Sequence, residues 1–164
     1  MSPPMSATLR PATIDDAPTI VNLIRELAIY EKLEYQVQAT PEALARHLFG
    51  DRPAAEVILA EVDHQAVGFA LFFGNFSSFR SQPGLYLEDI FVRSEHRGQG
   101  IGKALLARVA RIAVDRGCGR LEWSVLDWNQ PSIDFYRAKG AVPMDEWTVF
   151  RVTDAALIAL AGQN

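Results

Sequence analysis

The sequence predicts an α/β domain of the α+β type, in which a mixed, mostly antiparallel, twisted sheet is flanked by helices. Three observations support this fold class. Apolar runs with helical period alternate with strand-like runs, two strand-like runs are joined by a tight polar turn, and a glycine-rich segment stands between a strand and a helix. The expected order of elements is β-α-α-β-β-β-α-β-α-β, which layers helices on a sheet.

The first elements are a short strand and a long helix. Residues 7–10 are strand-like and end at Pro11. Asp15 or Asp16 provides an N-cap for a helix over residues 17–33. The apolar positions of this helix share one face, which predicts that it packs on the sheet: Ile20, Leu23, Ile24, Leu27 and Ala28.

The remaining elements follow from similar signals. Thr40-Pro41-Glu42 combines an N-cap, a proline at the first helical position and an acid in the first turn, so a second helix is expected over 41–49, ended by Gly50. The later elements, in order, are strands over 55–62 and 66–76 joined by Asp63-His64-Gln65, a strand over 85–92, a helix from 101 to about 116 ended by Gly117, a strand over 120–126, a helix over 131–140 and a last strand over 147–152.

The composition limits the classes of function. The 164 residues carry a net charge of −4, whereas a nucleic-acid binder needs basic stripes, so no nucleic-acid partner is expected. The single Cys118 allows neither an internal disulfide nor a Cys/His zinc motif, so no metal is expected. The sequence contains no run of about 18 apolar residues, which is the length needed to span a membrane. We therefore expect one soluble, cytoplasmic domain over residues 1–164, with residues 1–6 as a disordered start.

The sequence RGQGIG at residues 97–102 predicts an anion-binding loop at the start of a helix. It is not the dinucleotide fingerprint GxGxxG, because Lys103 follows Gly102, and the Walker pattern fails at Arg97 and Ala104. The first turn of a helix has N–H groups without intrahelical acceptors, and its dipole favours an anion. Glycines allow a diphosphate to approach the backbone, and Arg97 would add a guanidinium. The alternative is a flexible turn with a good helix start.

The glycine segment and several other stretches of the sequence resemble those of a known family. Arg97-Gly98-Gln99-Gly100-Ile101-Gly102 resembles the [QR]xxGx[GA] motif of the GNAT superfamily of acyl-CoA N-acyltransferases, and the sequence is most similar to its spermidine/spermine (diamine) and thialysine acetyltransferase group. The resemblance extends from residue 9 to about 152. The shared stretches are RPAT, IRELAIYEKLE, LYLEDIFV, RGQGIG, WNQPSIDFY and a closing W-x-x-F.

The resemblance implies acetyl-CoA as cosubstrate. It places the backbone of the strand at Ile90, Phe91 and Val92 against the pantetheine arm and the oxyanion. The other residues that it implies for the cofactor are Arg97, Gly98, Gln99, Gly100, Ile101, Gly102, Lys103, Asn129, Ser132 and Tyr136.

Two side chains are candidates for acid–base catalysis. Strand alternation puts Tyr86, Glu88 and Ile90 on one face and Leu85, Leu87 and Asp89 on the other. By resemblance, Glu88 lies at the amine and collects its proton directly or through water, while Tyr136 protonates the leaving thiolate. The alternatives are a surface charge at Glu88 and a core aromatic at Tyr136.

The acceptor side rests on acidic and aromatic residues that could attract a cation. They are Tyr30, Glu31, Glu88, Glu122, Asp145 and Glu146. The expected activity is acetyl transfer from acetyl-CoA to a primary amine of a small polyamine or diamine, by direct attack in a ternary complex. The alternatives are an amino-acid side-chain amine such as that of thialysine, another small amine, or a non-catalytic CoA-binding regulatory module. A homodimer is expected by resemblance, with the last strand and the tail from Thr153 as its interface.

Overall fold

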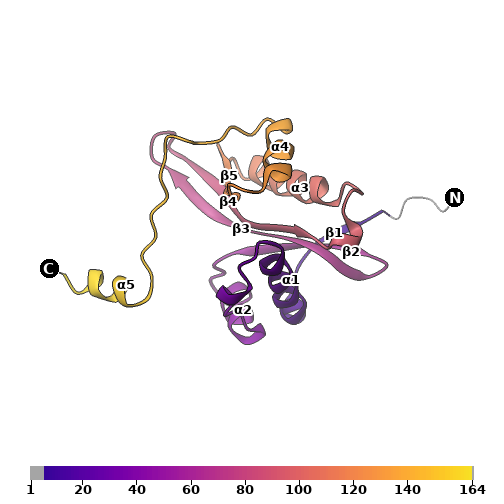
Figure 1. Ribbon diagram of the computed structural model, residues 1–164, viewed down its shortest axis with the longest axis horizontal. Helices are drawn as coiled ribbons and strands as arrows, with labels where there is room; N and C mark the ends of the chain where they lie inside the picture. Colours follow the sequence, from indigo (N-terminus) through magenta and orange to yellow (C-terminus); the bar gives the residue numbers. More distant parts are fainter. Residues whose placement is uncertain (1–5, 164) are drawn as a thin grey trace. The chain divides into compact units, whose positions relative to one another are not determined.

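The computed structural model describes residues 6–163, so the expected disordered start lies almost wholly outside the described residues. The chain divides into two compact units at the Leu126–Asp127 junction. The first unit holds one sheet with helices on both faces (Figure 1), and the second holds two short helices and a long extended connection.

The sheet confirms the predicted mixed and mostly antiparallel topology. Its spatial order is β1-β2-β3-β4-β5, with antiparallel pairs from β1 to β4 and a parallel pair between β4 and β5. The strands are β1 (Thr8–Pro11), β2 (Glu56–Val62), β3 (Gln65–Ser77), β4 (Gln82–Val92) and β5 (Leu121–Trp123). The strand expected over 120–126 is thus real but short.

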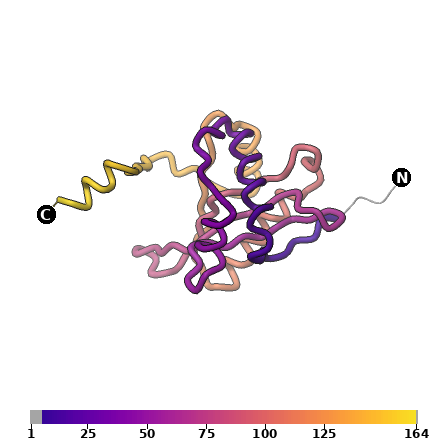
Figure 2. Tube along the Cα trace, turned by 90° about the horizontal axis from the view of Figure 1, so that it is seen from below, coloured from indigo at the N-terminus to yellow at the C-terminus, as the bar shows by residue number. Residues whose placement is uncertain are grey.

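Helices cover both faces of the sheet. In Figure 1, α1 (Ala17–Tyr30) and α2 (Pro41–Leu48) lie below it and α3 (Ile101–Asp115) lies above it; Figure 2, seen from below, has α1 and α2 in front of the strands. The main apolar cluster joins α1 to the lower face of the sheet, as its predicted amphipathic face requires. Its buried members are Ile20, Leu23, Leu27, Val57, Leu59, Phe69 and Phe91.

Local signals in the first unit are confirmed by the geometry. The Thr40 side chain accepts a hydrogen bond from the Ala43 amide at 3.2 Å, so it caps α2 as predicted. The β2–β3 hairpin turns at Asp63 and His64, whose φ angles of 50° and 63° are those of a two-residue turn of the primed type. Gly117 ends α3 with a φ of 73°.

One predicted feature of β4 is wrong because the strand carries a β-bulge. Leu87 pairs with Phe72 and Asp89 pairs with Leu71, so Glu88 has no partner on β3. Adjacent residues of β3 point to opposite faces, and therefore Leu87 and Asp89 do too. Strict alternation had put these two side chains on the same face. The bulge turns Asp89 toward the face covered by α1.

The second unit departs from the prediction at its end. It contains α4 (Gln130–Ala138) and α5 (Asp154–Ala161), but the strand expected over 147–152 is absent there, and α5 was not expected. A strand needs a neighbouring edge for its hydrogen bonds, and this segment has none within its own unit. Its apolar side chains are left exposed, Val149 by 83% and Phe150 by 90%.

Candidate active site

The glycine segment forms an open cradle at the start of α3. Gly100 is the N-cap of the helix and brings no side chain to its first turn. The first backbone amide with an intrahelical partner here is that of Ala104, which donates to the Gly100 carbonyl at 3.0 Å. The preceding amides of the first turn therefore face outward with the positive end of the helix dipole, which is the arrangement that binds anions.

Two of the glycines are required by the backbone itself. Gly98 and Gly100 have φ angles of 76° and 81°, in the left-handed region that side chains disfavour. A Cβ atom built on either one would meet nothing within 4 Å, so space lies open above this turn. At Gly102 a Cβ would make an ordinary contact of 3.8 Å with Val92.

The edge of β4 next to this cradle is open. In the part of the chain that the structure describes, β5 pairs with β4 only from Leu85 to Leu87. The bulge at Glu88 follows at once, and the strand continues to Val92 with β3 on its other side only. Main-chain groups of Ile90 to Val92 on this edge could accept an extended ligand as an added strand.

The guanidinium of Arg97 contacts β4 and the end of α1. Its Nε donates to the Val92 carbonyl at 2.9 Å. Its Cζ lies 4.6 Å from the ring centroid of Tyr30 and 5.4 Å from that of Phe91. Both distances are within the range of cation–π contacts. The side chain thus links the start of the glycine loop to the end of α1.

The end of α1 presents Tyr30 and Glu31 at this same place. The Leu33 amide donates to the Ala28 carbonyl at 2.8 Å and the Lys32 amide to the Ile29 carbonyl at 3.0 Å, which is the Schellman pattern of a helix end. Burial raises the pKa of the Glu31 carboxyl. The two residues expected on the acceptor side are therefore close to Arg97 and to β4.

Beside them lies Asp89, a carboxylate that was not among the predicted site residues. Burial, with the nearby charges of Glu88 and Glu31, raises the pKa of Asp89 to about 7. Among the described residues no cation pairs with it. Glu88 itself is exposed in the bulge. The signal for Asp89 was its place beside a second acid within an apolar strand, but strict alternation had put its side chain on the face of Leu85 and Leu87.

The other predicted acceptor residue of the first unit is partly neutralised. Glu122 lies on β5 opposite Tyr86. Its carboxylate is 3.5 Å from the Arg120 guanidinium and from the side-chain amide of Asn75. Such a carboxylate contributes less negative potential to a cation site than an unpaired one.

The remaining predicted residues belong to the second unit. The buried Asn129 side chain accepts from the Ser132 amide at 3.4 Å, so it caps α4 as expected. Tyr136 follows on α4 with its ring edge-on to Phe135, 5.6 Å between centroids. Asp145 and Glu146 are exposed after the helix. The geometry within this unit fits the expected cap and leaves the roles of these side chains as predictions.

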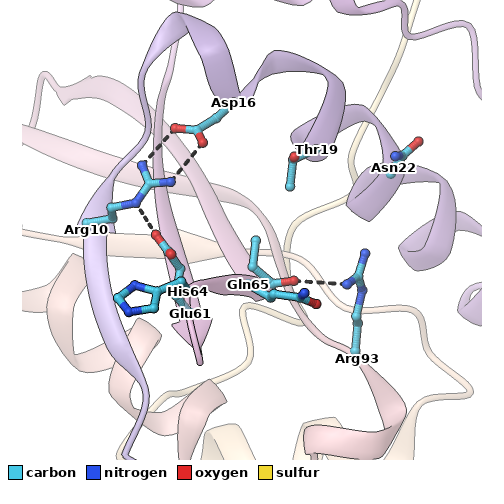
Figure 3. A pocket seen from close by; sticks show the side chains of 9 residues that line it. Arg10, Asp16, Thr19, Asn22, Glu61, His64, Gln65 and Arg93 are labelled. Carbon is cyan, nitrogen blue, oxygen red and sulfur yellow. Dashed lines mark hydrogen bonds and ion pairs between the residues drawn. The ribbon is translucent and has the colours of Figure 1, made fainter.

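A polar pocket beside the β2–β3 hairpin has a different character (Figure 3). It encloses about 330 Å³. Arg10 is paired with Asp16 and Glu61 across it, and Arg93 with Glu26 and the Ala66 carbonyl. Because its charges already have partners, this pocket ties elements together and offers little unpaired charge to a ligand.

Comparisons with known proteins agree with the fold. Residues 20–141 match the acetyltransferase (GNAT) family. The chain is 41% identical to the thialysine N-epsilon-acetyltransferase of Bos taurus, over 94% of this chain and 97% of that protein. It is 36% identical to the L-ornithine N5-acetyltransferase of Arabidopsis thaliana, over 98% and 90%. A solved integron cassette protein from the mobile metagenome of V. cholerae has 28% identity and a TM-score of 0.81, over 97% and 99%.

The mixed sheet flanked by helices is the fold of the GNAT acyltransferases. The chain belongs to the GNAT acetyltransferase family and is an acetyltransferase. The family uses acetyl-CoA as its acetyl donor. Within residues 6–163 no helix is both long and apolar enough to cross a membrane, and no group of three or more side chains could hold a metal ion.

Proposed function

We propose that the protein transfers an acetyl group from acetyl-CoA to a primary amine of a small molecule that carries a second amine. The observation that carries this proposal is the cluster of Glu31, Glu88 and Asp89, which has no cationic partner among the described residues. Polyamines and diamines are one acceptor class. Amino acids with a terminal side-chain amine are the other, and the names of the two relatives above favour it.

The donor side would be held by main chain. The outward amides at 98–103 fit a diphosphate, and the open edge at Ile90 to Val92 fits a pantetheine arm and an oxyanion. Gln99 and Lys103 are exposed on this loop and its helix, where they could contact the nucleotide. Asn129, Ser132 and Tyr136 are proposed as further contacts of the cofactor.

The chemistry would run by direct attack. A primary ammonium has a pKa near 10 and must lose a proton before it attacks the thioester carbonyl. Glu88 would accept this proton directly or through water, with Asp89 beside it to hold the cation. Tyr136 would give a proton to the leaving thiolate, for which a phenol is suited.

The test of the function is acetyl-CoA turnover with a panel of amines. Spermidine, putrescine, ornithine, thialysine and a monoamine of equal length are compared by kcat/KM, with thiol release as the readout. We expect compounds with two amines to exceed the monoamine by at least tenfold. Tyr136→Phe should retain acetyl-CoA binding and lose most of kcat, while Tyr35→Phe, at a ring that is 78% exposed, serves as the control. No turnover with any amine would refute the proposal.

The cradle predicts a specific effect of Gly100→Ala. The new methyl group would stand where the diphosphate is expected, so the affinity for CoA should fall about tenfold or more in calorimetry. Gly117→Ala is a matched control, because Gly117 also has a positive φ of 73° and open space above it but ends α3 instead. Both variants lose similar stability. Equal CoA affinities in the two would contradict the cradle.

We also propose a cytoplasmic homodimer with no nucleic-acid or membrane partner. The single cysteine and the net charge of −4 support the compartment and the absence of nucleic acid. The dimer is supported by the exposed apolar tail, in which Val149, Phe150 and Ile158 are at least 75% exposed. Removal of residues 147–163 should convert the dimer to a monomer in sedimentation experiments.

A further inference from the structure

The guanidinium of Arg97 stands at the junction of the two halves of the proposed site. On one side, Gly98 begins the glycine loop with its left-handed turn. On the other, the ring of Tyr30 lies under the guanidinium at 4.6 Å from its Cζ atom. A residue whose main chain starts the donor loop therefore has its side chain on the acceptor side.

Two of the three contacts of this guanidinium are fixed by the core. Phe91 is only 7% exposed and belongs to the apolar cluster under α1. The Val92 carbonyl, which accepts from Nε at 2.9 Å, is main chain of β4. The third contact, Tyr30, is the last residue of α1 and is 37% exposed. Because its contacts with β4 anchor the Arg97 guanidinium, it can restrict the orientation of the Tyr30 ring more than the ring can restrict the guanidinium.

Restricting Tyr30 has a consequence for the acidic cluster. Glu31 follows Tyr30 directly and lies close enough to Asp89 to raise the pKa of that carboxyl. Rotation of the end of α1 would move Tyr30 and Glu31 together, because they share one Schellman turn closed by the amides of Lys32 and Leu33. A stack that fixes the end of α1 would therefore also fix Glu31 relative to Asp89.

We propose that Arg97 is a positioning residue for the acceptor amine, which holds Tyr30 and with it Glu31 in place through cation–π stacking. This inference rests on the proposed function. It assigns the side chain of Arg97 to the acceptor and leaves the diphosphate to the main-chain amides that follow it. A planar guanidinium can stack on two rings and donate to a carbonyl at once, whereas a lysine cannot.

The first experiment separates the two sides by kinetics and binding. In Arg97→Ala and Arg97→Lys we expect the KM for the amine to rise about tenfold, while the Kd for CoA, measured by calorimetry, changes less than about twofold. Arg111→Ala removes an exposed guanidinium of α3 and controls for net charge. A tenfold weaker CoA complex with an unchanged amine KM would overturn the proposal.

A double-mutant cycle tests whether Arg97 acts through Tyr30. Tyr30→Phe keeps the ring and should keep most of the positioning by Arg97. Tyr30→Leu removes the ring and with it the cation–π stack. If the stack is the route, Tyr30→Leu combined with Arg97→Ala should raise the amine KM by about as much as either change alone. If the double variant raised the amine KM by the product of the two single effects, about a hundredfold, the route through Tyr30 would be refuted.

A readout without turnover keeps the two proposals apart. With 3-fluorotyrosine placed at position 30, Arg97→Ala should shift the fluorine resonance and Arg111→Ala should not. If the wild-type protein acetylates no amine, the proposed function fails while this shift still reports the stack. If acetylation is found but the resonance does not move, the positioning role of Arg97 is refuted on its own.

Discussion

Two groups of carboxylates in the first unit have opposite surroundings. Near the β2–β3 hairpin, Asp16 and Glu61 both bind the guanidinium of Arg10. At the β4 bulge, the charges that act on Asp89 within residues 6–163 are the like charges of Glu88 and Glu31. The hydrogen bonds from Arg10 lower the pKa of Asp16 to about 2, whereas burial and repulsion raise the pKa of Asp89 to about 7.

The difference separates paired carboxylates, which stabilise the fold, from carboxylates without a cation, which are available to bind a cationic ligand. Burial disfavours ionisation of both carboxyls, so the presence of a cation decides the direction of each shift. A buried acid without a cation reduces stability when it ionises, and such acids cluster at functional sites. A bound ammonium would supply for Asp89 what Arg10 supplies for Asp16.

The largest expected effect is on turnover. Asp89→Asn removes the charge next to the proposed amine site, so kcat/KM for a diamine should fall about a hundredfold. Asp16→Asn should leave kcat/KM within about twofold, because it lies in the paired group. The measurement is thiol release at saturating acetyl-CoA. Similar losses in both variants would show that the comparison does not separate function from structure.

The second prediction concerns the pH dependence of stability. The folded-state pKa of Asp89 is about 7 and the unfolded value is 3.8, so the folded protein binds the extra proton between these values. The free energy of unfolding should therefore fall as the pH rises from about 4 to 7. Asp89→Asn should flatten this slope and add about 2 kcal/mol at pH 8, a value reduced for partial solvent screening.

Urea unfolding of both proteins at pH 5 and pH 8 gives this difference directly. The kcat/KM profile of the wild-type protein should rise through pH 7 as Asp89 ionises. A stability gain from Asp89→Asn that is equal at pH 5 and pH 8 would mean that ionisation of Asp89 carries no cost in the fold.

Asp16→Asn is expected to act with the opposite sign. The pKa of Asp16 is lowered from 3.8 to about 2, so its stabilisation is present above pH 4 and is lost as the pH falls toward 2. The substitution should lower the free energy of unfolding by about 1 kcal/mol at pH 7, because Arg10 is partly exposed and water screens the pair. A variant as stable as wild type would show that Glu61 alone suffices for Arg10.

The sequence was sufficient where a local rule decides the structure. The cap at Thr40, the turn at Asp63-His64 and the end of α3 at Gly117 each follow from the chemistry of one or two residues. The glycine loop was predictable for the same reason, since φ angles near 80° at Gly98 and Gly100 select glycine.

The sequence was insufficient where pairing between distant segments decides the structure. The bulge at Glu88 depends on the register of β4 against β3, and it moves Asp89 to the face of α1, where Glu31 lies. The stack of Arg97 on Tyr30 joins segments 67 residues apart. The strand expected over 147–152 had the right composition but no edge to pair with in its own unit.

The smallest prediction compares two of the left-handed turns of the first unit. The hairpin places Asp63 and His64 at φ angles of 50° and 63°, while the donor loop uses Gly98 and Gly100. A side chain with positive φ costs free energy that glycine avoids, so His64→Gly should raise the free energy of unfolding by about 0.5 kcal/mol and leave acetyl transfer unchanged. The hairpin tolerates the strained residues because nothing must approach its backbone, whereas the donor loop needs the space as well as the conformation. Thermal unfolding with parallel kcat/KM measurements checks both parts, and a loss of activity would mean that the hairpin communicates with the site.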